Sequence, residues 1–181
     1  MIKIIDNFLD KELNEKINNR LIQKNFNWHI AESMTNDDDK NFMFYHTGIE
    51  DQKICTYRGI FNDIFFPVLR SIESHRHFPY EYLKNNDRFP KAWRAKINCY
   101  TKNKDFEFSN WHTDNEKDHL VAIYYINSND GFTELKNTGK IESKANRLVL
   151  FSGNIEHRAI AHTDTNLRLN MNINYIKRED K

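Results

Sequence analysis

The sequence predicts an α+β domain in which helices come first and a run of short strands follows. The first half contains apolar residues at the i, i+4 spacing of amphipathic helices. The second half contains short segments that are rich in β-branched and aromatic residues and separated by turn-like segments. This order predicts a C-terminal sandwich or barrel, with the helices covering one outer face.

The length and composition of the chain limit the classes of protein to which it can belong. Its 181 residues, of which 39% are hydrophobic, are enough for one domain (1–181) with a core. No apolar run reaches the roughly 18 residues of a membrane span, and the N-terminus has no signal-peptide pattern. Cys55 and Cys99 lack metal or disulfide spacing, so we expect buried free thiols in a reducing, cytoplasmic setting.

The N-terminal half is predicted to hold a strand and two helices. Residues 2–9 are typical of a short strand, and Asp10 is a plausible N-cap for the helix that follows. That helix carries Leu13, Ile17 and Leu21 on one face. A second helix is predicted from Thr56 to Glu73, and Pro67 should kink or divide it. Residues 34–41 and 84–91 are typical of polar loops.

Four strands are predicted in the second half, at residues 92–101, 119–127, 147–153 and 168–176. In the last of them, alternation places Leu169, Met171, Ile173 and Tyr175 on one face, where they can pack as core. The other face carries Arg168, Asn170, Asn172 and Asn174. Such a polar face either lines a barrel that holds a polar ligand or faces solvent from an edge strand. Inside a barrel, the arginine could pair with a carboxylate.

The stretch "NWHTDNE" (110–116) places His112 and Asp114 one residue apart. On a strand, both side chains would point the same way and could reach one ion. His157, which follows an apolar strand and a Ser-Gly-Asn turn, is the candidate third ligand. Two histidines and a carboxylate form the facial triad of non-haem Fe(II) sites. The alternative is a solvated loop, because a lone HxD often arises by chance. We expect the other histidines on the surface or in loops: His29, His46, His75, His77, His119 and His162.

Five segments together resemble the 2-oxoglutarate and Fe(II)-dependent dioxygenases, particularly the prolyl-hydroxylase-like branch. They are "IKIIDNFLDKELNEKI", "INCYTKNKDFEFSNWHTD", "VAIYYINSNDGFTEL", "RLVLFSGNIEHRA" and "LRLNMNINYI". The resemblance covers most of the chain and implies a double-stranded β-helix (jelly-roll) core with N-terminal helices packed on one outer face. It assigns Fe(II) to His112, Asp114 and His157, and the distal carboxylate of 2-oxoglutarate to Arg168.

The resemblance also suggests which residues surround the cosubstrate. Tyr100 and Tyr125 lie where the family often places tyrosines, although each could equally be a core aromatic with a satisfied hydroxyl. Asn98 and Asn172 are further candidates for the same pocket. Two departures concern loops: "DGFTEL" has one glycine where many relatives have two, and "KNKDFEF" has none. The latter suggests a longer substrate-side loop.

The function implied by the resemblance is hydroxylation of a C–H bond, with O₂ consumed and 2-oxoglutarate converted to succinate and CO₂. Ascorbate is a candidate reductant. The expected substrate is a polar small molecule or a peptidyl residue such as proline. Three alternatives stay open: a non-catalytic jelly-roll binding module, a cupin-like hydrolase or isomerase that uses another divalent ion, and a nucleobase-oxidising dioxygenase. Arg168 weighs against the second, which has no need to hold a dicarboxylate.

Charge argues against a nucleic-acid partner. With 27 basic and 26 acidic side chains, the chain offers little of the non-specific phosphate attraction that usually dominates such binding. The expected partners are therefore a small molecule or a peptide, with no membrane. The counter-hypothesis is that folding gathers basic residues beside the metal, namely Arg88, Lys91, Arg94, Lys96, Lys102 and Lys104.

Overall fold

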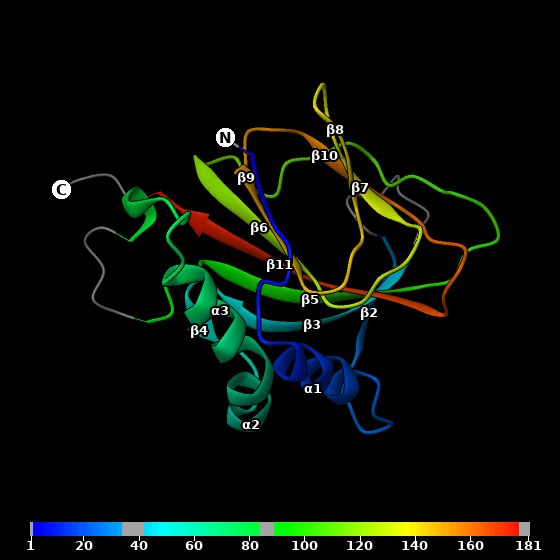
Figure 1. The fold of residues 1–181 in the computed structure, drawn as a ribbon, viewed down its shortest axis with the longest axis horizontal. Coiled ribbons are helices and arrows are strands. Elements are labelled where there is room, and N and C mark those ends of the chain that lie inside the picture. Colours follow the sequence, from blue (N-terminus) through cyan, green and yellow to red (C-terminus); the bar gives the residue numbers. More distant parts are fainter. Residues whose placement is uncertain (1, 34–41, 84–88, 178–181) are drawn as a thin grey trace.

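Two antiparallel sheets form the core of the chain (Figure 1). A computed structural model describes residues 2–33, 42–83 and 89–177. The predicted loop at 34–41, most of the one at 84–91, and Arg88 therefore lie outside the described residues. The large sheet has the order β1-β9-β6-β11-β5-β3-β2, with β4 paired to β3, and the small sheet has the order β10-β7-β8.

The strands of the large sheet are β1 (Ile2–Ile5), β2 (His29–Ala31), β3 (Met43–Glu50), β4 (Lys53–Ile54), β5 (Arg94–Thr101), β6 (His119–Tyr125), β9 (Arg147–Ser152) and β11 (Leu167–Ile176). Those of the small sheet are β7 (Phe132–Leu135), β8 (Gly139–Glu142) and β10 (His157–Ile160). The helical segments are α1 (Lys11–Leu21), α2 (Arg58–Ile60), a π-helical turn (Phe61–Phe65), α3 (Phe66–Glu73) and a short 3₁₀ turn (Tyr80–Tyr82).

The helices cover the face of the large sheet that points away from the small one (Figure 1). The Asp10 side chain accepts the backbone N–H of Glu12 at 2.9 Å and so caps α1 as predicted. Ile17 and Leu21 are buried against the sheet. The second predicted helix is divided by the π-helical turn, and α3 carries Pro67 in its first turn. The expectation of helices on one outer face is confirmed.

Gly48 lets this helical layer approach the sheet closely. It lies at an irregularity of the β3–β5 pairing, between Thr47 and Ile49. A Cβ atom added at Gly48 would lie 2.4 Å from the ring of Phe65, which is fully buried. No real Cβ contact is this short, so the missing side chain is what admits the aromatic ring.

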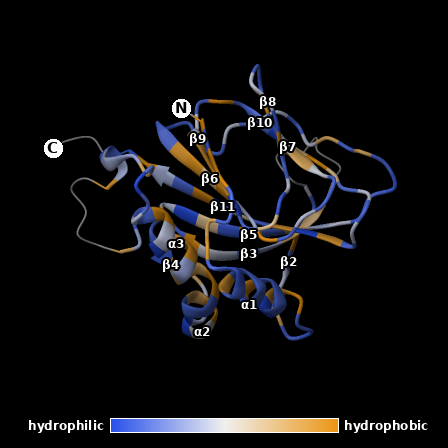
Figure 2. Cartoon of the chain, viewed as in Figure 1, coloured by the Kyte–Doolittle hydropathy of each residue, from blue (hydrophilic) through white to orange (hydrophobic). Residues whose placement is uncertain are grey.

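The opposite face of the large sheet packs on the small sheet. Val121, Ile123 and Phe151 of β6 and β9 contact Leu135 and Ile141 of β7 and β8. Figure 2 shows mostly hydrophobic colouring along β6, as expected for a strand buried on both faces. The result is a jelly-roll sandwich. Among the described residues, the apolar cluster between its two sheets lies on the side of β6 and β9.

The predicted order of elements is wrong in one respect. Strands β2, β3 and β4 lie between α1 and α2, so strands do not simply follow helices. The eight residues of β3 include His46 and Gly48, which interrupt the apolar alternation that would mark a strand in sequence.

Several single-residue expectations also need correction. His46 of β3 and His119 of β6 are buried in strands, not on the surface or in loops, whereas His162 is buried but lies in a loop as expected. The ring nitrogens of His46 lie 2.7 Å from the Asn27 carbonyl oxygen and the Thr56 hydroxyl, which compensates its burial. Cys99 is a buried free thiol as expected, but Cys55 is exposed.

No helix in the described part of the chain is long and apolar enough to cross a membrane.

Candidate active site

Strands β5 and β11 present a polar face toward the small sheet. Their antiparallel register pairs Tyr100 with Arg168, Asn98 with Asn170, Lys96 with Asn172, and Arg94 with Asn174. Directly opposed residues share one side of a sheet, so these eight residues form one surface, here called the polar face. Because β11 lies between β5 and β6, the edge-strand alternative is wrong.

The polar face borders a pocket of about 180 Å³. The pocket is also lined by His112, Asp114 and His157. Further lining residues had no role predicted for them individually: Met43, Ser109, Thr113, Thr133 and Ala159. The apolar residues of β11 that alternate with the polar face pack on the helix side of the sheet. The polar residues therefore face a cavity, not solvent.

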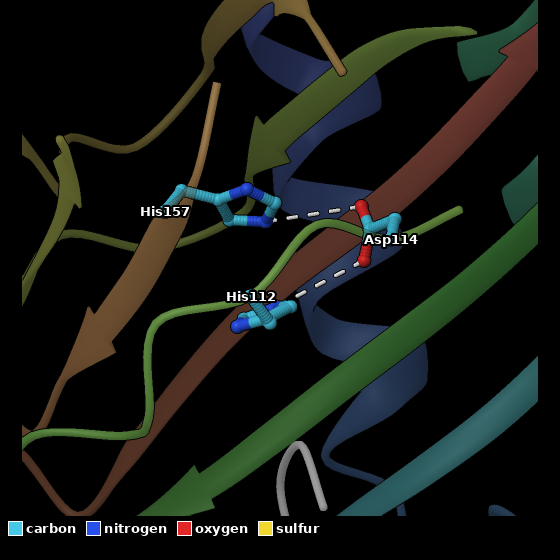
Figure 3. A group of neighbouring side chains, drawn as sticks. All are labelled: His112, Asp114 and His157. Carbon is cyan, nitrogen blue, oxygen red and sulfur yellow. Dashed lines mark ion pairs between the residues drawn. The ribbon is translucent and has the colours of Figure 1, made fainter. Parts of the chain in front are cut away.

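His112, Asp114 and His157 converge in this pocket (Figure 3). Their potential ligand atoms all lie within 4.8 Å of one another. Both imidazoles lie on the same side of Asp114, with their ring centres 4.5 Å apart. Oδ1 of Asp114 is 4.0 Å from Nε2 of His112, and Oδ2 is 3.8 Å from Nε2 of His157. Two donors that each lie about 2.1 Å from one ion are at most about 4.2 Å apart. Both imidazole–carboxylate pairs meet this limit.

The position of His112 comes from pairing with β10 and not from a regular strand. The backbones of His112 and His157 exchange two hydrogen bonds, at 3.1 and 2.9 Å. Upstream, the Ser109 N–H donates to the Ala159 carbonyl, while the Ser109 hydroxyl accepts the Ala159 N–H. The segment thus follows β10 irregularly and leaves it after His112. Asp114 therefore does not lie on a strand with His112, contrary to expectation, although the two side chains do converge.

Hydrogen bonds orient both imidazoles for ligation. Nδ1 of His112 lies 3.0 Å from the Asn110 carbonyl oxygen, and Nδ1 of His157 lies 3.3 Å from that of Ile155. A carbonyl can only accept, so Nδ1 carries the proton and Nε2 keeps its lone pair. Burial lowers the pKa of His157 from its ordinary value. Both effects favour the neutral ring that a metal requires.

Two amides hold the carboxylate. The Nδ2 atoms of Asn172 and Asn174 donate to Oδ2 of Asp114 at 3.1 and 2.9 Å. The Asp114 side chain is only 8% exposed. Burial alone would raise its pKa, but the His157 ring, the two amides and His112 together lower the pKa to about 2. Asp114 is therefore ionised across the physiological range.

Arg168 brings a second charge into the pocket. Its side chain is 1% exposed, and its guanidinium donates to the Ile160 carbonyl at 2.7 Å. Within the described ranges, no carboxylate lies close enough to form an ion pair with it, and its Nε has no hydrogen-bond partner. A buried, uncompensated guanidinium is costly. The pocket is therefore built to receive an anion at this end.

Tyr100 and Tyr125 both lie beside Arg168, but in different ways. The guanidinium carbon is 5.4 Å from the centre of the Tyr100 ring, which lines the pocket. The Tyr125 hydroxyl donates at 2.7 Å to the Thr133 hydroxyl, which also lies 3.4 Å from the arginine. Burial raises the pKa of both phenols, so both keep their protons.

Asn98 and Asn172 line the pocket too, and each has a side-chain oxygen without a partner. Asn98 donates to Asn170 at 3.2 Å. The unpartnered oxygens of these amides can accept hydrogen bonds from a bound molecule. Of the other basic residues of the counter-hypothesis, Arg94 and Lys96 line the pocket, whereas Lys91, Lys102 and Lys104 do not.

The fold itself matches solved structures over nearly its whole length. A prolyl hydroxylase from Trichoplax adhaerens, solved with a peptide fragment of the hypoxia inducible factor oxygen degradation domain, superposes with a TM-score of 0.66 at 16% identity, covering 97% of this chain and 83% of that one. The chain has the fold of the 2-oxoglutarate and Fe(II)-dependent oxygenases. Within that fold it is of the prolyl-hydroxylase-like form.

Two bacterial structures have the same fold. An oxidoreductase of the 2OG-Fe(II) oxygenase family from Burkholderia pseudomallei has a TM-score of 0.68 at 11% identity, covering 98% of this chain and 86% of that one. A prolyl-4-hydroxylase from Pseudomonas putida has a TM-score of 0.64 at 14% identity, with 99% and 93% covered. Neither a protein-family model nor a curated protein matches the sequence. At these identities the likeness establishes the fold, and function must be argued from the site.

Proposed function

We propose that this protein is an Fe(II)- and 2-oxoglutarate-dependent oxygenase that hydroxylates a C–H bond of a polar small molecule or a peptidyl residue. The observation that carries the proposal is the buried, unpaired Arg168 in the same pocket as a His-Asp-His cluster. A metal alone would not need this arginine. A dicarboxylate that also binds the metal accounts for both features.

The residues fit the groups they would hold. His112, Asp114 and His157 supply two neutral nitrogens and one carboxylate oxygen, the donor set that suits Fe(II) and leaves open positions. Arg168 offers a planar pair of donors to a carboxylate, and Thr133 and Tyr125 lie next to it. When bound, Fe(II) with 2-oxoglutarate and O₂ supplies the oxidant for hydroxylation, giving succinate and CO₂.

The other residues of the pocket orient the candidate ligands and shield the reacting groups from water. Asn172 and Asn174 fix the Asp114 carboxylate, and carbonyl groups fix both imidazoles. Ile123 and Ala159 add apolar lining, which limits the water around the reacting groups. The resemblance to prolyl hydroxylases, one of them solved with a peptide, supports a peptidyl substrate as one of the two classes.

The test is formation of succinate from 2-oxoglutarate by purified protein with Fe(II), ascorbate and air. We expect slow turnover without substrate, lost in His157→Ala and kept in His77→Ala, whose exposed ring lies outside the pocket. Arg168→Lys should raise the KM for 2-oxoglutarate at least about tenfold, because an ammonium cannot reproduce the two-donor fork.

The alternatives make different forecasts. A non-catalytic binding module would bind 2-oxoglutarate without forming succinate. A metalloprotein with another chemistry would bind metal with no response to 2-oxoglutarate, and an unchanged KM in Arg168→Lys would show that the cosubstrate is held elsewhere. Stimulation of succinate formation by oligonucleotides would promote nucleobase oxidation.

A further inference from the structure

The pocket has a second basic end, which the cosubstrate does not explain. Arg94 and Lys96 lie on β5 on the same side as Tyr100, opposite Asn174 and Asn172. At about 3.3 Å per residue, Lys96 is roughly 13 Å and Arg94 roughly 20 Å along the strand from Tyr100. A five-carbon diacid with one carboxylate at Arg168 is too short to reach Arg94.

The ammonium group of Lys96 has no close anionic partner among the described residues. Its Nζ lies 5.6 Å from the centre of the Tyr45 ring, and within the described residues no carboxylate lies within 4.0 Å of it. Burial and the nearby Arg94 lower the pKa of Lys96 to about 8, against the opposing attraction of Asp114 and Glu50. A lysine in this state is still mostly charged at neutral pH and would gain from a nearby anion.

Arg94 is only weakly compensated. Its Nε is 3.9 Å from Oε2 of Glu50, beyond hydrogen-bond length, and the Glu50 side chain is 50% exposed. Such a surface pair contributes little. Glu50 does not line the pocket, whereas Arg94 does.

The charges of the loaded pocket do not balance. The lining carries three cations, Arg94, Lys96 and Arg168, against one carboxylate, Asp114. A divalent metal adds two positive charges and 2-oxoglutarate adds two negative charges, so these two groups cancel. The excess of positive charge on the lining residues therefore remains. The surplus lies at Arg94 and Lys96, because Arg168 is matched by the cosubstrate.

We propose that the substrate carries an oxyanion, a carboxylate or a phosphate, which Arg94 and Lys96 bind at the end of the pocket opposite Arg168. This inference rests on the proposed function for the placement of the cosubstrate. It narrows the substrate from any polar molecule to an anionic one. Arg94 can form a two-donor contact with the oxyanion, and Lys96 adds a point charge.

The wild-type protein tests this directly. Protein loaded with Mn(II) in place of Fe(II), kept free of O₂ so that no turnover occurs, and saturated with 2-oxoglutarate is titrated calorimetrically with matched probes. The carboxylate pair is N-acetyl-L-proline and N-acetyl-L-prolinamide, and the phosphate pair is glycerol 3-phosphate and glycerol. We expect at least one anion to bind about tenfold or more tightly than its neutral partner, and the pair that shows it identifies the oxyanion. Equal affinities within both pairs would overturn the proposal.

Variants test whether Arg94 and Lys96 cause the preference for the anionic probe. In Lys96→Met and Arg94→Gln the preferred anion should bind as weakly as its neutral partner, and Lys96→Arg should keep most of the preference. Lys102→Met and Arg76→Gln remove exposed cations outside the pocket and should change nothing. A preference that survives both pocket variants would place the anion elsewhere and refute the inference.

The two proposals can fail separately. Succinate formation by the wild-type protein without substrate reports on the oxygenase function and does not involve Arg94 or Lys96. Its absence would refute the oxygenase, whatever the anions do. Its presence, with no discrimination between anion and neutral probe, would refute only the anionic substrate.

Discussion

Asp114 depends on two neighbours of the same kind. The amides of Asn172 and Asn174 both donate to its Oδ2, and both belong to the polar face of β11. This fixes the rotation of the carboxylate and helps to keep its pKa at about 2. Asparagine is unfavourable in strands, so its repetition here indicates a role for the side chains.

Removing one amide should weaken metal binding. We expect Asn174→Ala to lower the Mn(II) affinity about tenfold or more, the usual effect of losing a group that orients a ligand. Asn170→Ala is the matched control, since Asn170 lies on the same face but contacts Asn98 instead. Titration of Mn(II) followed by electron paramagnetic resonance measures both. Equal losses in the two variants would show a general disturbance of β11, and no loss in either would show that Asp114 needs no support.

The candidate ligands could be found from the sequence, but the residues around them that complete the pocket could not. His112, Asp114, His157 and Arg168 were recognisable from spacing and from a resemblance, and the structure places all four in one pocket; their roles stay predictions. Thr133, beside Arg168, was missed. It lies on a four-residue strand, where alternation says which residues share a face but not which face meets the pocket.

Among the elements, Glu73 joins the end of α3 to the segment that leads into β5. Its Oε1 accepts the backbone N–H of Lys91 at 2.9 Å. Burial raises its pKa from 4.5 to about 7. At pH values between these two pKa values, Glu73 is protonated in the folded state but ionised in the unfolded chain. The free energy of unfolding therefore falls as pH rises through this range. The cost is absent below pH 4.5 and complete above about 7.

Glu73→Gln should remove this dependence while its amide oxygen still accepts the Lys91 N–H. Relative to wild type, the variant should gain unfolding free energy progressively from pH 5 to 8, by up to about 3 kcal/mol. Urea denaturation at several pH values measures the difference. Asp63→Asn removes an exposed carboxylate in the same helical region and should show no such trend. A constant difference between Glu73→Gln and wild type across this range would mean that Glu73 does not titrate as described.

The elements that were predicted correctly share a local signal. β6, β9 and β11 are runs of apolar, aromatic or strictly alternating residues, and α1 has a cap and an apolar stripe. Strands β7, β8 and β10 have four residues each and were not predicted as separate strands. Their stability comes from pairing with one another and from packing on the large sheet. Such long-range support leaves little mark on the local sequence.

At the scale of the whole molecule, the candidate metal site joins the two sheets. His157 begins β10 of the small sheet, whereas Asp114 is hydrogen-bonded to β11 of the large one. An ion held by both would add a link between layers that also meet through the apolar contacts at β6 and β9 and through the hydrogen bonds of Arg168 and Tyr125 to the small sheet. The unfolded chain cannot hold three ligands this distant in sequence in one geometry, so metal binding should stabilise the folded state.

Metal should therefore raise the melting temperature. At free Mn(II) about 100 times its Kd, the gain is about 2.7 kcal/mol, which corresponds to roughly 5–10 °C for a chain of this size. Differential scanning calorimetry with and without Mn(II) measures the shift, and a chelator should reverse it. His157→Ala should abolish the shift because it removes the only one of the three ligands that the small sheet supplies, whereas His77→Ala should retain it. If His157→Ala were stabilised as much as wild type, the ion would be binding elsewhere, and the link between the sheets would not exist.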